Sequence, residues 1–161
     1  MEKLTEQQKE IFEAYYYKNS EYYIERLEKY INNEKNTFSI KGFFLGLFWM
    51  SYRKMYKIVI IIFLILLFET YLEEILYAYN LMPEFLYQLL GKAGLIIWGT
   101  IYGFIANRLY IAKSIKDIDK ISNSYSDIEQ CKERAKLKGG VNWFAPFVLL
   151  LIIIVLLIIA T

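Results

Sequence analysis

Histidine is absent from this chain of 161 residues, and cysteine occurs once, at Cys131. Without histidine the chain lacks the commonest general base and the commonest metal ligand of proteins. A single cysteine excludes an intramolecular disulfide. There is also no glycine-rich phosphate loop and no nucleophile elbow, and the neighbouring Glu73 and Glu74 would point in different directions on a helix. The sequence therefore predicts neither an enzyme nor a cofactor or metal site.

Apolar residues, in contrast, are abundant. The chain is 57% hydrophobic and yet 22% charged. These two values are compatible because the charged residues lie in different segments from the apolar runs. Residues 58–68 and 147–160 are two such runs. A soluble domain of this length could not bury both and still cover itself with polar surface. We therefore predict an all-α integral membrane protein, inserted by internal spans because the charged N-terminal segment has no apolar signal-peptide core.

The apolar and charged segments divide the chain into predicted elements. In order, these are a cytoplasmic helical region (1–37), an interfacial segment (38–57), a first span (58–76), an external turn (77–88), a second span (89–112), a cytoplasmic amphipathic helix (113–140) and a third span (143–160). The first span must reach residue 76, because the run 58–68 would rise only about 16 Å as a helix, whereas a bilayer core measures about 30 Å. The result is a chain with three membrane-spanning helices.

The distribution of Lys and Arg predicts the orientation of these spans. Ten of them lie in residues 1–57 and eight in 108–138, whereas the segment between the first two spans holds one, Lys92. Cytoplasmic loops carry the excess of positive charge in membrane proteins. We therefore expect the N-terminus and the 113–140 helix in the cytoplasm, the turn after the first span outside, and Thr161 at the external face.

A basic cluster at Arg53, Lys54 and Lys57 follows the aromatic segment 38–52. In the middle of one long span, each of these charges would raise the free energy of membrane insertion by about 2.5–3.5 kcal/mol. The segment is therefore predicted to lie in the membrane interface, where aromatic rings are favoured, with a re-entrant half-helix as the alternative. The predicted interface anchors are Phe43, Phe44, Phe48, Trp49, Tyr52, Arg53, Lys54, Tyr56 and Lys57.

Five polar residues fall within the predicted spans: Glu69, Glu73, Lys92, Asn107 and Arg108. An acid inside a span is a candidate functional group, although the favoured interpretation places Glu69 near the external interface, facing protein or water. Glu73 and Lys92 are expected at similar depth, which predicts an ion pair between them. Arg108 can extend toward the cytoplasmic interface, and Asn107 needs a hydrogen-bond partner wherever it faces protein.

Small residues at Gly99, Gly103 and Ala106 lie on one side of the second span. Such residues let membrane helices approach each other closely. We expect this face to pack inside the chain, against the first or the third span, in preference to forming a dimer interface.

The N-terminal region is predicted to form two short helices. Thr5 and Gln8 fit a capping box, and Tyr23 and Leu27 begin a stripe with helical spacing. This stripe has two interpretations: a helical hairpin packed on itself or on the membrane surface, and a tyrosine-lined docking face for a partner. The polar residues 32–36 then link this region to the aromatic segment.

Three blocks of the chain form a recognisable set: a tyrosine-rich polar start, an aromatic block that ends in YRKMY, and the block GFIANRLY. The positions concerned are Phe43, Phe44, Gly46, Phe48, Trp49, Tyr52, Arg53, Lys54, Met55 and Tyr56, then Gly103, Ala106, Asn107, Leu109 and Tyr110. Over about residues 15–140, the chain resembles a bacterial membrane family catalogued as domain of unknown function 2628. The resemblance implies an integral protein of the bacterial cytoplasmic (inner) membrane and no known activity.

Two functions from different classes stay open at this level. The first is a non-catalytic accessory, scaffold or regulatory membrane protein whose cytoplasmic helices contact a protein partner. The second is a subunit of a small oligomeric channel or transport component, or a membrane effector or its immunity protein. Three spans are too few to enclose a pathway, so a channel requires a homo-oligomer. The lipid bilayer is the expected partner in both cases, and nucleic acid is not, because the basic residues are interleaved with acids beside the spans.

Overall fold

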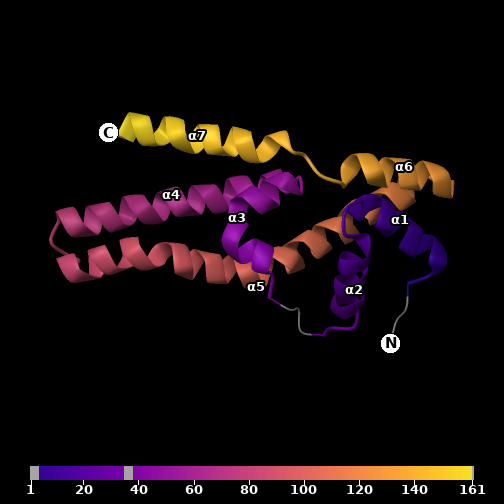
Figure 1. The fold of residues 1–161 in the computed structure, drawn as a ribbon, viewed down its shortest axis with the longest axis horizontal. Helices are drawn as coiled ribbons and strands as arrows, with labels where there is room; N and C mark the ends of the chain where they lie inside the picture. The colour runs from indigo at the N-terminus through magenta and orange to yellow at the C-terminus, as the bar shows by residue number, and fades with distance from the viewer. Residues whose placement is uncertain (1–3, 35–37, 161) are drawn as a thin grey trace.

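The computed structural model describes residues 4–34 and 38–160, and these residues form seven helices and no strand (Figure 1). The helices are α1 (Glu6–Tyr16), α2 (Ser20–Ile31), α3 (Ile40–Tyr52), α4 (Tyr56–Ala78), α5 (Glu84–Ser124), α6 (Ile128–Lys138) and α7 (Phe144–Ala160). The predicted all-α class is confirmed. Residues 1–3 and 35–37, which belong to the predicted N-terminal region and linker, and Thr161 lie outside the described part of the chain.

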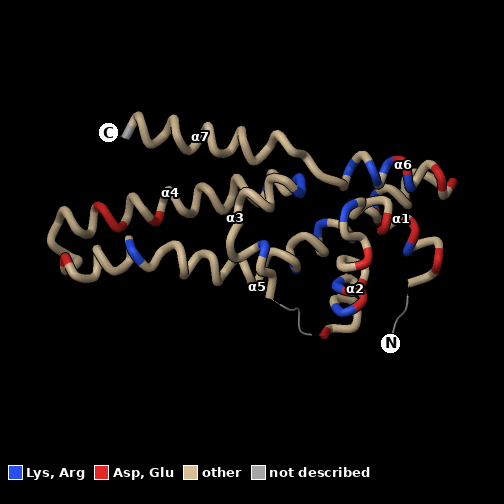
Figure 2. The backbone as a smooth tube through the Cα atoms, in the orientation of Figure 1, with Lys and Arg blue, Asp and Glu red and all other residues tan. Residues whose placement is uncertain are grey.

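Figure 1 shows the helices arranged as a cap and three arms. The helical cap consists of α1, α2, α6 and the second half of α5. The arms are α4, the first half of α5 and α7, which extend from the cap in one direction. Most Lys, Arg, Asp and Glu residues lie on the cap, and few lie in the arms (Figure 2). Charged and apolar residues are therefore separated in space as well as in sequence.

Local sequence signals set several helix ends. At the start of α1, the Thr5 hydroxyl accepts from the Gln8 amide and the Thr5 amide donates to the Gln8 side chain, which completes the predicted capping box. The Asp127 carboxylate caps α6 by accepting from the amide of Gln130. α5 differs from the prediction, because it continues as one helix of 41 residues to Ser124. Residues 104–124 contain no glycine or proline that would end it at 112.

Tyrosines form the centre of the cap. Tyr15, Tyr16 and Tyr23 are at most 1% exposed, and Leu27 is 0% exposed. Tyr23 meets Tyr110 of α5 edge to face, with ring centroids 5.0 Å apart. Such aromatic pairs add to the stabilisation from burial alone. The predicted tyrosine stripe therefore packs inside the chain, as the hairpin interpretation expects, and the surface it packs on belongs to α5.

α4 and α5 form a helical hairpin at the far end of the arms. Asn80 adopts a left-handed conformation with φ 56°, and Pro83 precedes the first residue of α5. The rings of Tyr77 and Tyr87 stack across the hairpin with centroids 4.5 Å apart. The turn lies inside the predicted external segment 77–88, although the helices extend into both of its ends.

Within the described residues, α5 is the one helix long and apolar enough to cross a membrane by length and composition. Only 22% of its most apolar stretch is buried, whereas the core helix of a soluble protein is mostly buried. α4 has 23 residues but carries Lys57 at one end and Glu69 and Glu73 toward the other. α7 is apolar throughout but has 17 residues. These lengths and compositions therefore support membrane association most directly for α5.

Candidate functional site

The cap and the arms are joined at α3, which is bent into two limbs. Gly46 interrupts the helix with φ 41° and ψ −118°, a conformation that L side chains rarely adopt. The first limb starts where the Ser39 amide donates to the carbonyl of Gly103 at 2.7 Å, and runs along α5 to the level of Gly99. The second limb returns toward the cap, where Trp49 meets the ring of Tyr110. The segment therefore forms two limbs that both contact α5, and its interfacial or re-entrant position stays a prediction.

The predicted small-residue face of α5 contacts this first limb. A Cβ atom at Gly99 would lie 3.0 Å from the carbonyl oxygen of Phe43. From the other side, a Cβ at Gly42 would lie 2.8 Å from both the Ala106 Cβ and the Tyr102 carbonyl oxygen. The small residues thus pack inside the chain, as expected. Their partner is α3, however, and not the first or third predicted span.

Arg53, predicted as a headgroup anchor, lies at the centre of the junction. Its side chain is only 2% exposed, and its guanidinium donates to the carbonyl oxygens of Tyr16 and Lys18, both at 3.0 Å. The guanidinium also lies over the rings of Tyr23, at 4.6 Å, and Tyr110, at 5.3 Å. It forms no ion pair with a carboxylate of the described residues, and its Nε atom has no partner there. Arg53 therefore joins α3 to the end of α1 and to α5, and its contacts are with protein.

A polar network beside Arg53 connects α1 to α5. The Tyr15 hydroxyl donates to Asp117 at 2.7 Å, and the Lys113 ammonium donates to Asp117 at 2.8 Å. Burial alone would raise the pKa of Asp117, but these two hydrogen bonds, together with the charges of Lys113 and Lys138, outweigh that effect and hold the pKa below its usual value. Burial and the bond to Asp117 raise the pKa of the Tyr15 hydroxyl, which therefore stays a neutral donor. The Tyr16 and Ser114 hydroxyls form a second, fully buried hydrogen bond at 2.7 Å.

Next to this network is a concave basic surface, which we call the lysine groove. Its cavity has a volume of about 630 Å³ and lies between the start of α4, the second half of α5 and the end of α6. The lining includes six lysines and one acid: Lys54, Lys57, Lys113, Lys116, Lys120, Lys138 and Asp117. Its apolar lining residues are Met55, Ile58, Leu109, Ala112 and Leu137. The groove thus combines strong positive charge with an apolar part of its lining.

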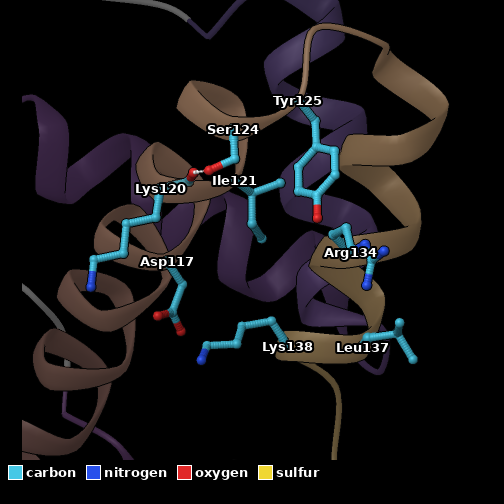
Figure 3. A pocket seen from close by; sticks show the side chains of 8 residues that line it. All are labelled: Asp117, Lys120, Ile121, Ser124, Tyr125, Arg134, Leu137 and Lys138. Carbon is cyan, nitrogen blue, oxygen red and sulfur yellow. Dashed lines mark hydrogen bonds between the residues drawn. The ribbon is translucent and has the colours of Figure 1, made fainter.

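A smaller cavity of about 410 Å³ adjoins the lysine groove and shares four of its lining residues. Figure 3 shows Lys138 of α6 extending toward Asp117 of α5, with Lys120 on the other side of Asp117. Arg134 lies against the ring of Tyr125, 5.4 Å from its centroid. The basic surface therefore continues from the junction onto the cap.

The other predicted interface anchors divide between protein and surface. Phe44 is 75% exposed, whereas Trp49 is buried. Tyr52 is half-buried against the ring of Trp143 at the start of the last arm. The remaining anchors are Phe43 and Phe48, both half-buried, and Lys54, Tyr56 and Lys57, which line the groove. An interface role stays a prediction for the exposed members.

The polar residues predicted within the spans also separate into two groups. Glu69 accepts a hydrogen bond from the Trp98 indole at 2.7 Å, and the buried Asn107 donates to the Tyr22 hydroxyl at 2.8 Å. Lys92 and Arg108 are exposed, Glu73 is half-buried, and none of the three forms an ion pair in the described part of the chain. The predicted Glu73–Lys92 pair is therefore not formed.

The YRKMY block and the GFIANRLY block, far apart in sequence, thus meet at the junction, where Arg53 contacts Tyr110. A family model described as "Protein of unknown function (DUF2628)" matches residues 5–115. The chain belongs to the DUF2628 family. The match covers α1 to α4 and most of α5, so the DUF2628 region contains the Arg53 contacts but not α6 or α7. No curated protein and no solved structure matched the chain.

Several important residues of this DUF2628 protein were not singled out as site residues from its sequence. Gly46 produces the bend in α3, and Gly42 allows its close approach to α5. Lys113, Lys116 and Lys120 recur with helical spacing, a signal that could have indicated one side of the groove. The groove residues of α4 and α6, such as Lys57 and Lys138, could not be predicted from helical spacing, because only the tertiary structure brings these helices next to α5.

Proposed function

We propose that this DUF2628 protein is a non-catalytic scaffold or accessory component of the bacterial cytoplasmic membrane, with three spanning arms and a cytoplasmic helical cap. The observation that carries the proposal is the separation of apolar arms from the charged cap. A membrane provides the apolar surroundings that exposed side chains along the arms require. The cap then provides a folded surface at the cytoplasmic face.

Exposure of large apolar side chains supports a membrane location for all three arms. On α4, Ile60, Ile61 and Leu64 are each 58% exposed. On α5, Leu95 is 88% exposed, and on α7, Ile159 is 75% exposed. Apolar patches of this extent rarely face water in a monomeric soluble protein. Glu73 and Glu74 of α4 lie near the hairpin end, where the helix would reach the external interface, and Glu69, farther from that end, accepts a hydrogen bond from Trp98.

The buried polar side chains form hydrogen bonds within the protein, which supports a scaffold role in preference to catalysis. Arg53 bonds to the carbonyl of Tyr16, and Asp117 and Lys113 both bond to the Tyr15 hydroxyl, which fixes α1 against α3 and α5. Because the tyrosine stripe is buried, a partner would contact the exposed polar faces of α1, α2 and α6 instead. The alternative of an oligomeric channel receives less support, because Glu69 and the glycine face are engaged within the chain.

Site-directed labelling tests the topology. In a Cys131→Ser background, single cysteines at Asn80 in the hairpin turn and at Ser126 in the cap are labelled with a membrane-impermeant maleimide. We expect labelling of Asn80→Cys in cells whose inner membrane is intact, and labelling of Ser126→Cys only after permeabilisation. Equal labelling of both in intact cells would contradict the proposed arrangement.

Particle mass in detergent separates the scaffold from the channel. Light scattering of the purified chain should give a mass close to the 19.2 kDa of one copy after the detergent is subtracted. A defined homo-oligomer that conducts ions in planar bilayers would favour the channel. In that case, Glu69→Gln should change the conductance, whereas the scaffold proposal expects no conductance from either form.

A further inference from the structure

The positive charge of the lysine groove is not neutralised within the protein. Its one acid, Asp117, is already engaged by Lys113 and the Tyr15 hydroxyl. The other five lysines of the groove form no ion pair in the described residues. Lys54 donates instead to the carbonyl oxygen of Leu137 at 3.1 Å. The groove therefore holds six lysines and a single internal counter-charge, Asp117.

Several of these lysines lie where the protein's own electrostatics disfavour them. Lys57 is in the first turn of α4, the end of a helix that disfavours positive charge. Lys116 and Lys120 are one turn apart on α5, a spacing at which like charges destabilise a helix. Burial, together with the charge of Lys113, lowers the pKa of Lys54. Fold stability does not account for this arrangement, whereas an external anion would.

The apolar lining residues of the groove limit which anionic ligands would fit it. Ile58 and Leu109 line the groove and lie at the base of two arms, α4 and α5. Beyond them, Ile60 and Ile61 continue the exposed apolar surface along α4. A ligand that follows this surface needs an anionic group at one end and a hydrocarbon portion at the other. A small soluble anion would use the lysines alone.

We propose that the lysine groove binds the phosphate of an anionic phospholipid headgroup, with the acyl chains lying along the apolar surface at the base of α4 and α5. Lysine is a common phosphate-binding side chain, and basic pockets at the cytoplasmic side of membrane helices bind anionic headgroups. A volume of about 630 Å³ lies within the range of small-molecule sites. The acyl-chain part of the proposal rests on the proposed membrane location of the arms.

The test compares lipid binding to matched charge variants of the full chain in detergent micelles. Native mass spectrometry and a titration with phosphatidylglycerol measure affinity, with phosphatidylcholine and inorganic phosphate as the comparison probes. The groove variant is Lys116→Gln with Lys120→Gln, both at exposed positions. The control variant is Lys9→Gln with Lys136→Gln, which removes the same charge outside the groove.

We expect the groove variant to lose about tenfold or more of its affinity for phosphatidylglycerol, because each juxtamembrane lysine contributes about 1 kcal/mol. The control variant should stay within about twofold of the natural chain, and thermal unfolding should show that both variants are folded. Phosphatidylcholine should bind the natural chain and the groove variant alike.

Two outcomes would overturn the proposal. Equal losses in the groove and control variants would mean that net charge, and not the groove, attracts the lipid. Binding of inorganic phosphate as tight as that of phosphatidylglycerol would identify a soluble anion as the ligand. The lipid titration is made in micelles, so its result does not depend on how the protein is oriented in a membrane. A failure of the topology experiment and a failure of the lipid-binding proposal can therefore be distinguished.

Discussion

Arg53 illustrates how one side chain holds the junction together without a carboxylate partner. Its guanidinium bonds to two backbone carbonyls and lies against two tyrosine rings, so its charge is stabilised by dipoles and by aromatic faces. The planar fork of arginine suits this site, whereas the ammonium of lysine is a compact point charge. Burying a charge is costly unless its hydrogen bonds are made, so the loss of either carbonyl contact should weaken the cap.

At the residue scale, we predict that Arg53→Lys destabilises the cap by about 2 kcal/mol, because one hydrogen bond to a charged group is lost. The buried thiol of Cys131 provides the measurement, since it reacts with maleimide only when the cap opens. Labelling should be much faster in the variant. The control is Arg108→Lys at an exposed arginine of α5, which should react at the natural rate. Equal rates in all three proteins would show that the Arg53 contacts contribute little.

Asp117 gives a pH-dependent prediction at the same scale. Hydrogen bonds hold its pKa below the usual value of 3.8, so its contribution to stability is present above that value and is lost as the pH falls through the folded-state pKa. We expect Asp117→Asn to be less stable by about 1–2 kcal/mol at pH 7, because Lys113 loses its charged acceptor. Thermal unfolding of both proteins should show this difference shrinking below about pH 4. A difference that is independent of pH would contradict the assigned role.

At the element scale, the contact of α3 with α5 depends on the absence of side chains. Gly42 lies against the backbone of Tyr102, and its Cβ position is only 2.8 Å from that carbonyl oxygen. Gly46 then reverses the direction of α3 in a conformation that other residues adopt at a cost. The aromatic segment therefore forms two packed limbs, where hydropathy alone predicts an interfacial helix.

We predict that Gly42→Ala destabilises the protein by about 1–3 kcal/mol, because a methyl group at this contact forces the two helices apart. Gly91→Ala is the matched control on the arm of α5, where no atom lies within 4 Å of the added Cβ. It should be neutral or stabilising by up to about 1 kcal/mol, since alanine favours helix. Thermal unfolding in detergent compares the two. A Gly42 variant as stable as the Gly91 variant would mean that the helices separate without cost.

At the scale of the whole molecule, charge and hydropathy divide the chain into a cap and arms. α7 contacts the rest of the protein through α3, and nearly all its large side chains are exposed. Little protein packing therefore holds it in place, and under the proposed function its position depends on insertion into lipid. This makes α7 the arm most sensitive to charge.

We predict that Leu151→Arg with Val155→Arg prevents α7 from crossing the membrane, because each arginine near the bilayer centre costs about 2.5–3.5 kcal/mol. Both positions are exposed, at 61% and 46%, so packing is not disturbed. A C-terminal alkaline phosphatase, active only outside, should lose activity in this variant and keep it in the Leu151→Ala with Val155→Ala control. Unchanged activity in the arginine variant would argue against a spanning α7.

Much of the element structure followed from local patterns. The capping box at Thr5, the hairpin turn around Pro83 and the packing of Gly99 and Gly103 inside the chain were all predictable, since each depends on neighbouring residues or on a short periodic pattern. The length of α5 was not predicted, because a change from apolar to charged residues resembles a helix end although nothing in residues 104–124 breaks the helix.

The sequence by itself determined the separation of apolar and charged segments and the all-helical class, because both follow from how side chains partition between water and an apolar phase. It could not determine what each residue of the basic cluster contacts. Arg53 is buried against carbonyls 35 and 37 residues earlier in the chain, whereas Lys57 faces the groove. Two residues of the same charge, four positions apart, thus have opposite surroundings, because contacts distant in sequence decide which of them the protein encloses.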